Sequence, residues 1–507
     1  MADAPDDRPA LSENLAADVC VVGAGIAGLS IAYHLAREGR SVVVLDMHRI
    51  GGQETARTTA HLSDVLDEGM VELERLHGGE RARHAVAGHR AAIDRIEEIV
   101  QAEEIDCDFE RLDGFLVEAP GGEAVAFPDE ELDAARRLGF PDASRVADLA
   151  DFGLPGRPAI RFPAQAQLHP LRYMRGLARV IERDGGRLFA GTRAAQIEAR
   201  GGGVRVKTMD GNRIDAAAAV SATNTPITTR VAVHAKQAAY RSYAIGARVP
   251  RGTLPHALLW DTGDPYHYVR LLPDPADQRA EILIAGGEDH KTGQDEDPAV
   301  RFDRLEAWVR GLVPELGEVA FRWSGQVLEP ADGLAFLGRS PGEEHVFLVT
   351  GDSGHGMTHG TLGALIITDL IAGRENPWTE LFGPDRLTVQ AARALLGENL
   401  DAAARYANWL TGGDVADPAS LEPGWGAVMR RGLAKIAVFH APDGTVSERS
   451  AVCPHLGCIV AWNPVECTWD CPCHGSRFAA DGRVLHGPAI ADLAPADGEG
   501  DGSIRPG

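Results

Sequence analysis

Residues 18–46 read DVCVVGAGIAGLSIAYHLAREGRSVVVLD and set the architecture of the first part of the chain. An apolar strand is followed by three glycines, a largely apolar helix, a second strand and an acid. Gly23 allows the tight turn, Gly25 lets the backbone approach a pyrophosphate, and Gly28 permits close packing of the helix. The helix N-terminus then faces the phosphates, and Asp46 can bind ribose hydroxyls. This order predicts a dinucleotide-binding domain.

Two short boxes near the C-terminus carry a second kind of chemistry. The first reads CPHLGC over residues 453–458, and the second reads CPCHGS over residues 471–476. One Cys-x-His and one Cys-x-x-His supply two thiolates and two imidazoles. That set suits an iron-sulfur centre, and it could also hold zinc. Zinc would explain four of these residues but not the second cysteine pair, Cys458 and Cys473.

The two boxes resemble those of the Rieske 2Fe-2S domain, and their second cysteine pair makes them similar to the cytochrome bc type. The resemblance implies that two cysteines hold one iron and two histidines the other. The implied ligands are Cys453, His455, Cys471 and His474. It also implies a disulfide between Cys458 and Cys473. Replacing two thiolates with neutral imidazoles raises the reduction potential, so the cluster can accept an electron from a flavin.

The loop after the second strand of the dinucleotide-binding stretch reads GGQETARTTAH over residues 51–61. It resembles the matching segment of FAD-dependent amine oxidoreductases of the D-amino-acid oxidase and sarcosine oxidase family, and the resemblance covers roughly residues 15–375. In some relatives a histidine of this loop is bonded covalently to the flavin. The matching position here is Arg57, so we expect noncovalent FAD.

A second glycine-rich turn, GDSGHGMT over residues 351–358, follows a short apolar strand and precedes a helix that we expect to end near Ile371. It resembles the turn beneath the flavin ring in the same family. A helix N-terminus there would place backbone NH groups and a positive dipole end where reduction puts negative charge on the flavin. The cofactor-binding residues expected from this turn are Gly351, Gly354, His355, Gly356 and Met357.

Polar residues on or beside the strands of residues 231–325 lie where the family places substrate contacts. Together with two residues of the loop at 51–61, they give the candidate catalytic set: Arg57, His61, Tyr243, Tyr268, Arg270 and His290. Arg57 and Arg270 are alternatives for gripping a substrate carboxylate, because a guanidinium pairs with it bidentately. Each of the six is alternatively an ordinary structural residue.

The expected fold is α/β and α+β, with a Rossmann-like FAD-binding domain, an interleaved substrate domain and a small all-β C-terminal Rieske domain. The apolar spacing also predicts a helical segment over residues 70–104 and a helix over residues 387–410. The expected boundaries are a disordered N-terminus (1–15), the FAD-binding domain with inserted segments (16–230 and 325–375), the substrate domain (231–324), a helical connector (376–420), the Rieske domain (421–490) and an acidic tail (491–507).

The 507 residues carry a net charge of −24, which disfavours nucleic acid and anionic membrane surfaces as partners. The longest apolar run, residues 19–36, is explained by the dinucleotide-binding stretch, and an acidic segment precedes it rather than a basic signal region. We therefore expect a cytoplasmic protein without a membrane anchor. The expected roles of the other three cysteines are buried small apolar residues for Cys20 and Cys107 and a loop thiol for Cys467.

Only one dinucleotide site is visible in the sequence, so the reductant should be the organic substrate. We expect a dehydrogenase in which an amine or amino acid gives a hydride to FAD, leaving an imine that water hydrolyses. Electrons would then pass singly to the cluster and on to an external one-electron carrier. Two alternatives stay open: an oxygen-using amine oxidase with the cluster as a side branch, and a non-catalytic redox sensor or electron carrier.

Overall fold

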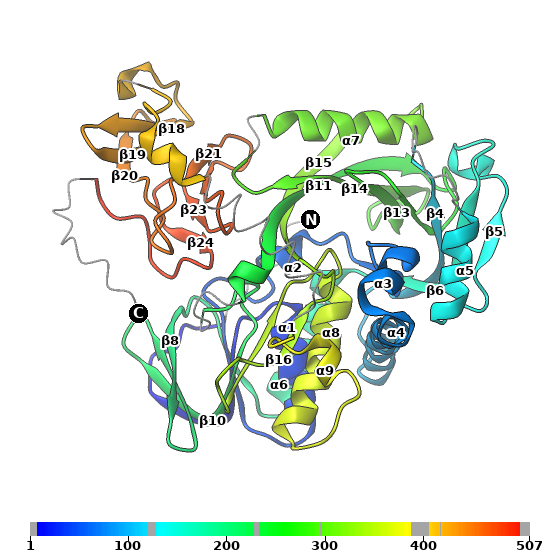
Figure 1. The fold of residues 1–507 in the computed structure, drawn as a ribbon, viewed down its shortest axis with the longest axis horizontal. Coiled ribbons are helices and arrows are strands. Elements are labelled where there is room, and N and C mark those ends of the chain that lie inside the picture. The colour runs from blue at the N-terminus through cyan, green and yellow to red at the C-terminus, as the bar shows by residue number, and fades with distance from the viewer. Residues whose placement is uncertain are drawn as a thin grey trace. The chain divides into compact units, whose positions relative to one another are not determined.

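The computed structural model describes residues 8–119, 128–227, 233–294, 297–386, 405–415 and 417–496 (Figure 1). The chain divides into two compact units. The first comprises residues 1–290 and 300–394, and the second comprises residues 291–299 and 395–507. The short segment 291–299 thus belongs to the second unit, although it lies between elements of the first in the sequence.

The first sheet of the first unit has the strand order β16, β17, β10, β1, β2, β7. At its centre, β1 (Leu15–Val22) pairs in parallel with β10 (Arg213–Ser221) and with β2 (Val42–Leu45). Helices α1 (Ile26–Arg37) and α8 (Gly356–Ile371) pack against its apolar side chains, as expected for a parallel sheet with covered faces. The other elements of this layer are α6 (Pro170–Arg183), β7 (Arg187–Phe189), β8 (Ala194–Arg200), β9 (Gly203–Thr208), β16 (Phe336–Arg339) and β17 (Val346–Thr350).

Two helices cover the residues that the sequence pattern assigns to one helical segment. Helix α3 (Met70–His77) ends before Gly78, and α4 (Gly79–Ala102) begins directly after it. Gly78 has a φ of +75°, a left-handed value that interrupts a right-handed helix and that glycine adopts without a Cβ clash. The predicted helical segment therefore consists of two helices that meet at this residue, because apolar spacing does not report backbone handedness.

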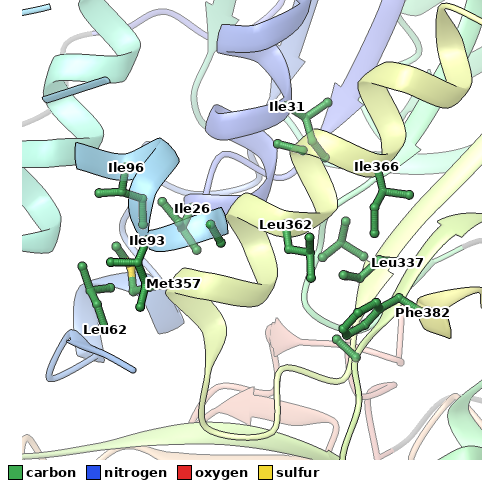
Figure 2. Packing of buried hydrophobic residues seen from close by; sticks show 14 of the residues in the cluster. Ile26, Ile31, Leu62, Ile93, Ile96, Leu337, Met357, Leu362, Ile366 and Phe382 are labelled. Carbon is green, nitrogen blue, oxygen red and sulfur yellow. The ribbon is translucent and has the colours of Figure 1, made fainter. Parts of the chain in front are cut away.

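The core of the first unit lies where α1, α4 and α8 meet (Figure 2). Ile31 of α1, Ile93 and Ile96 of α4, and Leu362 of α8 are each at most 1% exposed. Met357, in the first turn of α8, also points into this cluster. Burying each of these side chains favours folding by roughly 1.5–3 kcal/mol. The core therefore fixes the first turn of α8, and this turn belongs to the candidate site.

The second sheet has the order β15, β11, β14, β13, β12, β4, β6, β3, with β5 paired to β6. Its first members along the chain come from inserted segments of the expected FAD-binding domain, so this sheet draws on more of the chain than residues 231–324. Helix α7 (Ala299–Leu312) packs against one face, where Phe302 meets Tyr243 and Trp308 stacks on His267 (Figure 1). The strands are β3 (His61–Leu62), β4 (Glu110–Val117), β5 (Ser144–Val146), β6 (Ala159–Gln167), β11 (Gln237–Pro250), β12 (Leu258–Asp261), β13 (His267–Pro273), β14 (Ala280–Lys291) and β15 (Val319–Pro330). Short helices complete the unit: α2 (Glu54–Arg57), α5 (Asp129–Leu138), η1 (Ala150–Phe152), η2 (His234–Lys236) and α9 (Thr379–Phe382).

The second unit is built from two small antiparallel sheets. Trp469 and Phe478, on paired strands of the second of these sheets, are both 0% exposed and form its centre. Residues 387–404 of the expected connector helix and residues 497–507 of the expected tail lie outside the described residues, whereas residues 405–410 form a 3₁₀ helix. The elements are η3 (Arg405–Leu410), η4 (Pro418–Ser420), β18 (Trp425–Arg431), β19 (Ala434–His440), β20 (Val446–Ser450), β21 (Ala461–Asn463), β22 (Thr468–Asp470), β23 (Arg477–Ala479) and β24 (Val484–His486). Within the described ranges, no helix combines the length and apolar character needed to cross a membrane.

A buried ion pair in the first unit gives a test of the fold. Arg386 binds both carboxylate oxygens of Asp332, at 2.9 and 2.8 Å, and both side chains are 4% exposed. Replacing Asp332 with asparagine leaves the guanidinium buried without its charge partner, so we expect urea unfolding to show a loss of about 3–5 kcal/mol. The control is Asp129→Asn, which breaks an exposed pair with Arg145 and should cost less than about 1 kcal/mol. Equal losses of stability in the two variants would show that the buried pair is worth no more than the exposed one.

Candidate functional site

The glycine turn between β1 and α1 forms a cradle that side chains would fill. Gly23 has a φ of +100°, and a Cβ there would overlap the carbonyl oxygen of Ala222. A Cβ on Gly28 would overlap the carbonyl oxygen of Gly23, and one on Gly25 would lie 3.0 Å from Oγ1 of Thr55. The turn therefore requires glycine, and it leaves the N-terminus of α1 open to a bound pyrophosphate.

Asp46 closes this cradle at the end of β2. Its Oδ2 accepts a hydrogen bond from the backbone NH of Ala24 at 2.8 Å, and its Oδ1 accepts one from the NH of His48 at 2.7 Å. The side chain is 9% exposed. The carboxylate is thus held at the ends of the first two strands, as the sequence pattern predicts for a ribose-binding acid.

The second glycine turn joins β17 to α8. Gly351, Ser353 and Gly354 all have left-handed φ values, of +74°, +42° and +70°. The carbonyl oxygen of Asp352 accepts hydrogen bonds from the His355 NH at 2.8 Å and from Nδ1 of His359 at 2.9 Å. The turn is therefore tightly wound, and α8 begins at Gly356 with its free amide groups directed back along the helix axis.

Three acids, Asp67, Glu68 and Asp352, lie around His355 in this turn. Its Nε2 lies 3.0 Å from Oδ1 of Asp67. Burial opposes protonation of His355, but the negative charge and hydrogen bond of Asp67 outweigh it, so the pKa of His355 is raised. Burial raises the pKa of Glu68 to about 7 and that of Asp352 to about 6. The site therefore contains several groups whose protonation changes near neutral pH.

The titration of Glu68 predicts a pH dependence of stability. Its pKa is higher in the folded protein than in the unfolded chain, so its contribution to folding is complete below about pH 4.5 and is lost as the pH rises toward 7. Glu68→Gln removes the ionisable carboxyl group and with it this loss of stability at higher pH. In FAD-free protein the variant should match the wild type near about pH 5 and exceed its unfolding free energy by on the order of 3 kcal/mol at about pH 8. A difference that does not change with pH would contradict the expectation.

Three candidates, His61, Tyr268 and Arg270, meet on one face of the second sheet. Tyr268 packs edge-on against the ring of His61 at 4.9 Å and stacks on Tyr266 at 5.9 Å. The Tyr266 hydroxyl donates to Oδ2 of Asp289 at 3.4 Å. Arg270 follows Tyr268 by two residues on β13 and therefore points to the same face. This face brings together two of the predicted strand residues and His61 of the predicted loop.

Arg270 is a buried cation without a carboxylate partner among the described residues. It is 2% exposed. Its Nη1 donates to Oε1 of Gln167 at 3.2 Å and its Nη2 to the Leu168 carbonyl at 3.3 Å. Within the same residues its Nε has no hydrogen-bond acceptor. Burial lowers the pKa of Arg270 to about 9, and burial together with this positive charge lowers the pKa of His61 well below its usual value.

The other three candidates lie elsewhere. Tyr243 and His290 bond to each other, with the hydroxyl 2.9 Å from Nε2, and Tyr243 packs on α7. They therefore face α7, on the side of the sheet opposite Tyr268. Arg57 donates from Nη1 to the Ser324 carbonyl at 2.7 Å and so ties α2 to β15. The structure does not bring these three together with Arg270.

In the second unit the two cysteine and histidine boxes form matching loops. Cys453 NH donates to the Cys458 carbonyl at 2.8 Å, and Cys471 NH donates to the Ser476 carbonyl at 2.8 Å. A disulfide joins Cys458 to Cys473. This pairing, implied by the resemblance, ties one loop to the other.

The four expected cluster ligands converge between these loops. Cys453 and Cys471 are free, 1% and 2% exposed, and their thiols contact each other. The rings of His455 and His474 lie 5.0 Å apart at 88°. Nδ1 of His474 is buried without a partner among the described residues. Two thiols, two imidazoles and an orphaned ring nitrogen fit a 2Fe-2S cluster, with the remaining two cysteines held in the disulfide.

The family model for FAD dependent oxidoreductases matches residues 18–370, which is more than half of the chain. The chain belongs to this family. The model for the Rieske [2Fe-2S] domain matches residues 413–496. This member of the FAD dependent oxidoreductases is therefore an enzyme with two cofactors, FAD in the first unit and a 2Fe-2S cluster in the second.

Relatives of this FAD-dependent oxidoreductase cover both units, the first alone or part of the second alone. The Rieske 2Fe-2S iron-sulfur protein YhfW of Bacillus subtilis (strain 168) is 29% identical over 96% of this chain and 95% of its own. Gamma-glutamylputrescine oxidoreductase of Escherichia coli (strain K12) is 28% identical over 72% of this chain and 85% of its own. Glycine oxidase from Geobacillus kaustophilus shares the fold, with a TM-score of 0.60 and 18% identity over 74% of this chain and all of that one.

Sequence reasoning missed the acids and one tyrosine of the site. Asp67 and Glu68 stand side by side after an apolar run, and Asp289 directly precedes the candidate His290. Adjacent acids are common on exposed surfaces, so the pattern alone did not single them out. Tyr266 lies two residues before Tyr268, and this spacing was the available signal.

Proposed function

We propose that this enzyme is a dehydrogenase of an amine or amino acid. Bound FAD would accept a hydride from the substrate, and the electrons would pass singly through the Rieske cluster to an external one-electron carrier. The observation that carries the proposal is the buried guanidinium of Arg270 beside His61 and Tyr268, which has no carboxylate partner in the part of the chain that the structure describes. The cytoplasmic location expected from the sequence stays a prediction.

Arg270 is the better of the two predicted anchors for a substrate carboxylate. A guanidinium that is 2% exposed and whose acceptors, within the described ranges, are all neutral is costly to bury unless an anion joins it. A substrate carboxylate would supply that charge and would pair with the planar fork. Arg57 already bonds to the Ser324 carbonyl and holds two elements of the fold together.

His61 is suited to the amine end of the reaction. Its low pKa keeps the imidazole neutral at pH 7, and its Nε2 is buried without a partner among the described residues. In the tautomer protonated at Nδ1, this nitrogen can accept a hydrogen bond or a proton from a substrate ammonium group. Its contact with Tyr268 holds the ring in place.

Two acids near Tyr266, which stacks on Tyr268, favour a substrate with positive charge. Tyr266 bonds to Asp289, and Gly354 packs so closely that a Cβ there would lie 2.6 Å from Oδ2 of Asp67 and 3.7 Å from the Tyr266 hydroxyl. Arg270 and these carboxylates therefore offer opposite charges to the two ends of an amino acid. The names of the relatives, which include an amine derivative and an amino acid as substrates, support the same class.

Anaerobic mixing of the purified protein with a panel of amines and amino acids tests the proposal. We expect bleaching of the flavin absorbance by members of the panel, with amino acids faster than the amines that lack their carboxylate. Failure of every compound, alongside reduction by a protein donor, would favour the redox sensor. Hydrogen peroxide formed in a one-to-one ratio with oxidised substrate in air would favour the oxidase. FAD released by acid precipitation would agree with noncovalent binding.

A further inference from the structure

Residues outside the two boxes hold the first cluster loop. η3 presents two aromatic side chains to it. The Tyr406 hydroxyl donates to the carbonyl of Leu456, and Nε1 of Trp409 donates to the carbonyl of Gly457 at 3.0 Å. Leu456 and Gly457 lie between the expected ligand His455 and the disulfide cysteine. These bonds therefore fix the backbone directly after a ligand.

The second cluster loop is held by the segment that follows β14. Nε2 of Gln294 donates to the carbonyl of Pro472 at 3.2 Å. The Oε1 of the same amide accepts from Nη2 of Arg405 at 2.8 Å. Gly293 has a φ of +71°, and a Cβ there would lie 3.0 Å from the Asp470 carbonyl oxygen and from the nitrogen of Pro472. The backbone of this segment thus lies against the loop that carries Cys471 and His474.

Both sets of contacts belong to the second unit, and Arg405 connects them. It begins η3, whose side chains contact the first loop, and it orients the Gln294 amide that contacts the second. Each contacted carbonyl lies within two residues of an expected ligand. Partners of this kind that orient metal ligands commonly change metal affinity by about 10–100-fold when they are lost.

We propose that Gln294, Arg405, Tyr406 and Trp409 form a brace, distinct from the cysteine and histidine boxes, that positions both cluster loops and retains the 2Fe-2S cluster. The four residues act as positioning residues: Gln294, Tyr406 and Trp409 bond to loop carbonyls, and Arg405 acts through the Gln294 amide. The brace rests on the presence of the Rieske cluster, but it does not depend on the substrate or on the route of the electrons.

The brace is tested by the rate at which oxidised holoprotein loses its visible cluster absorbance in excess chelator. We expect Tyr406→Phe with Trp409→Phe to speed this loss by about 10-fold or more, and Gln294→Ala to do so to a similar extent. Arg405→Ala and Gln294→Ala share one hydrogen-bond path, so combining them should add little to either alone. Hydrogen exchange should rise in residues 453–458 for the aromatic variants and in residues 471–476 for Gln294→Ala.

Trp425→Phe is the matched control, because Trp425 lies in the same unit, is 48% exposed and is not part of the brace. It should leave the rate of cluster loss unchanged. Rates for the brace variants equal to that of this control, with no change in loop exchange, would overturn the proposal. A wild-type protein that never assembles a 2Fe-2S cluster would instead contradict the assignment of the two boxes as a cluster site. Retained flavin absorbance in each variant shows that the first unit has folded.

Discussion

Replacing Cys471 with serine is expected to abolish the Rieske electron paramagnetic resonance signal while leaving flavin reduction by substrate unchanged. Cys471 is buried at 2% exposure and contacts the thiol of Cys453, so no other thiolate among the described residues can take its place. The other two cysteines of the loops, Cys458 and Cys473, are already joined in the disulfide. Because FAD binds in the other unit, electron delivery to a one-electron acceptor should fall to background without loss of substrate binding.

Cys467→Ser is the control for this result. Cys467 is also free and lies in the same unit, but it is exposed and contacts the Pro464 carbonyl. Its replacement should leave the iron content and the resonance signal unchanged. Acceptor reduction that persists in Cys471→Ser at the wild-type rate would show that electrons leave the flavin without using the cluster.

Replacing Arg270 with methionine is expected to reduce kcat/KM for carboxylate-bearing substrates by roughly 150-fold, or about 3 kcal/mol. The physical reason is the loss of a desolvated, bidentate ion pair with the substrate. Arg270→Lys keeps the charge but loses the fork, so it should recover only part of the activity. Steady-state kinetics with a matched pair of substrates, one lacking the carboxylate, measures this selectivity directly.

Arg57→Met separates the two predicted arginines. If Arg270 is the anchor, Arg57→Met should lower stability through its lost bond to Ser324 without changing the preference for a carboxylate. Arg270→Met should remove the preference for a carboxylate and leave stability nearly unchanged. Removing a buried charge that has no carboxylate partner among the described residues costs the folded protein little. A carboxylate preference that disappears only in Arg57→Met would contradict the assignment.

The cofactor sites could be predicted from the sequence because each is encoded in a short contiguous stretch. The glycines at 23, 25 and 28 and the boxes at 453–458 and 471–476 carry their geometry in local spacing. The break at Gly78 could not be predicted in this way, because a left-handed φ leaves no trace in apolar periodicity.

The face of the second sheet that carries His61, Tyr268 and Arg270 was predicted only in part, and the reason lies in β14. Gly287 and Glu288 have φ values of +133° and +58°, which interrupt the alternation of side chains along the strand. Asp289 therefore joins Tyr266 on one face, while His290 joins Tyr243 on the other. Regular alternation counted along the sequence assigns such residues to the wrong faces. The brace around the cluster depends on contacts between distant segments and has no local signal.

Rapid mixing without oxygen tests whether substrate electrons reach the cluster through the flavin. Enzyme and an amino acid that bleaches the flavin are frozen at successive times, and the reduced Rieske signal is followed by electron paramagnetic resonance. We expect the signal to appear after flavin bleaching, and to be missing in Cys471→Ser, where bleaching is unchanged. A flavin that bleaches fully while the wild-type cluster stays oxidised would contradict this expectation.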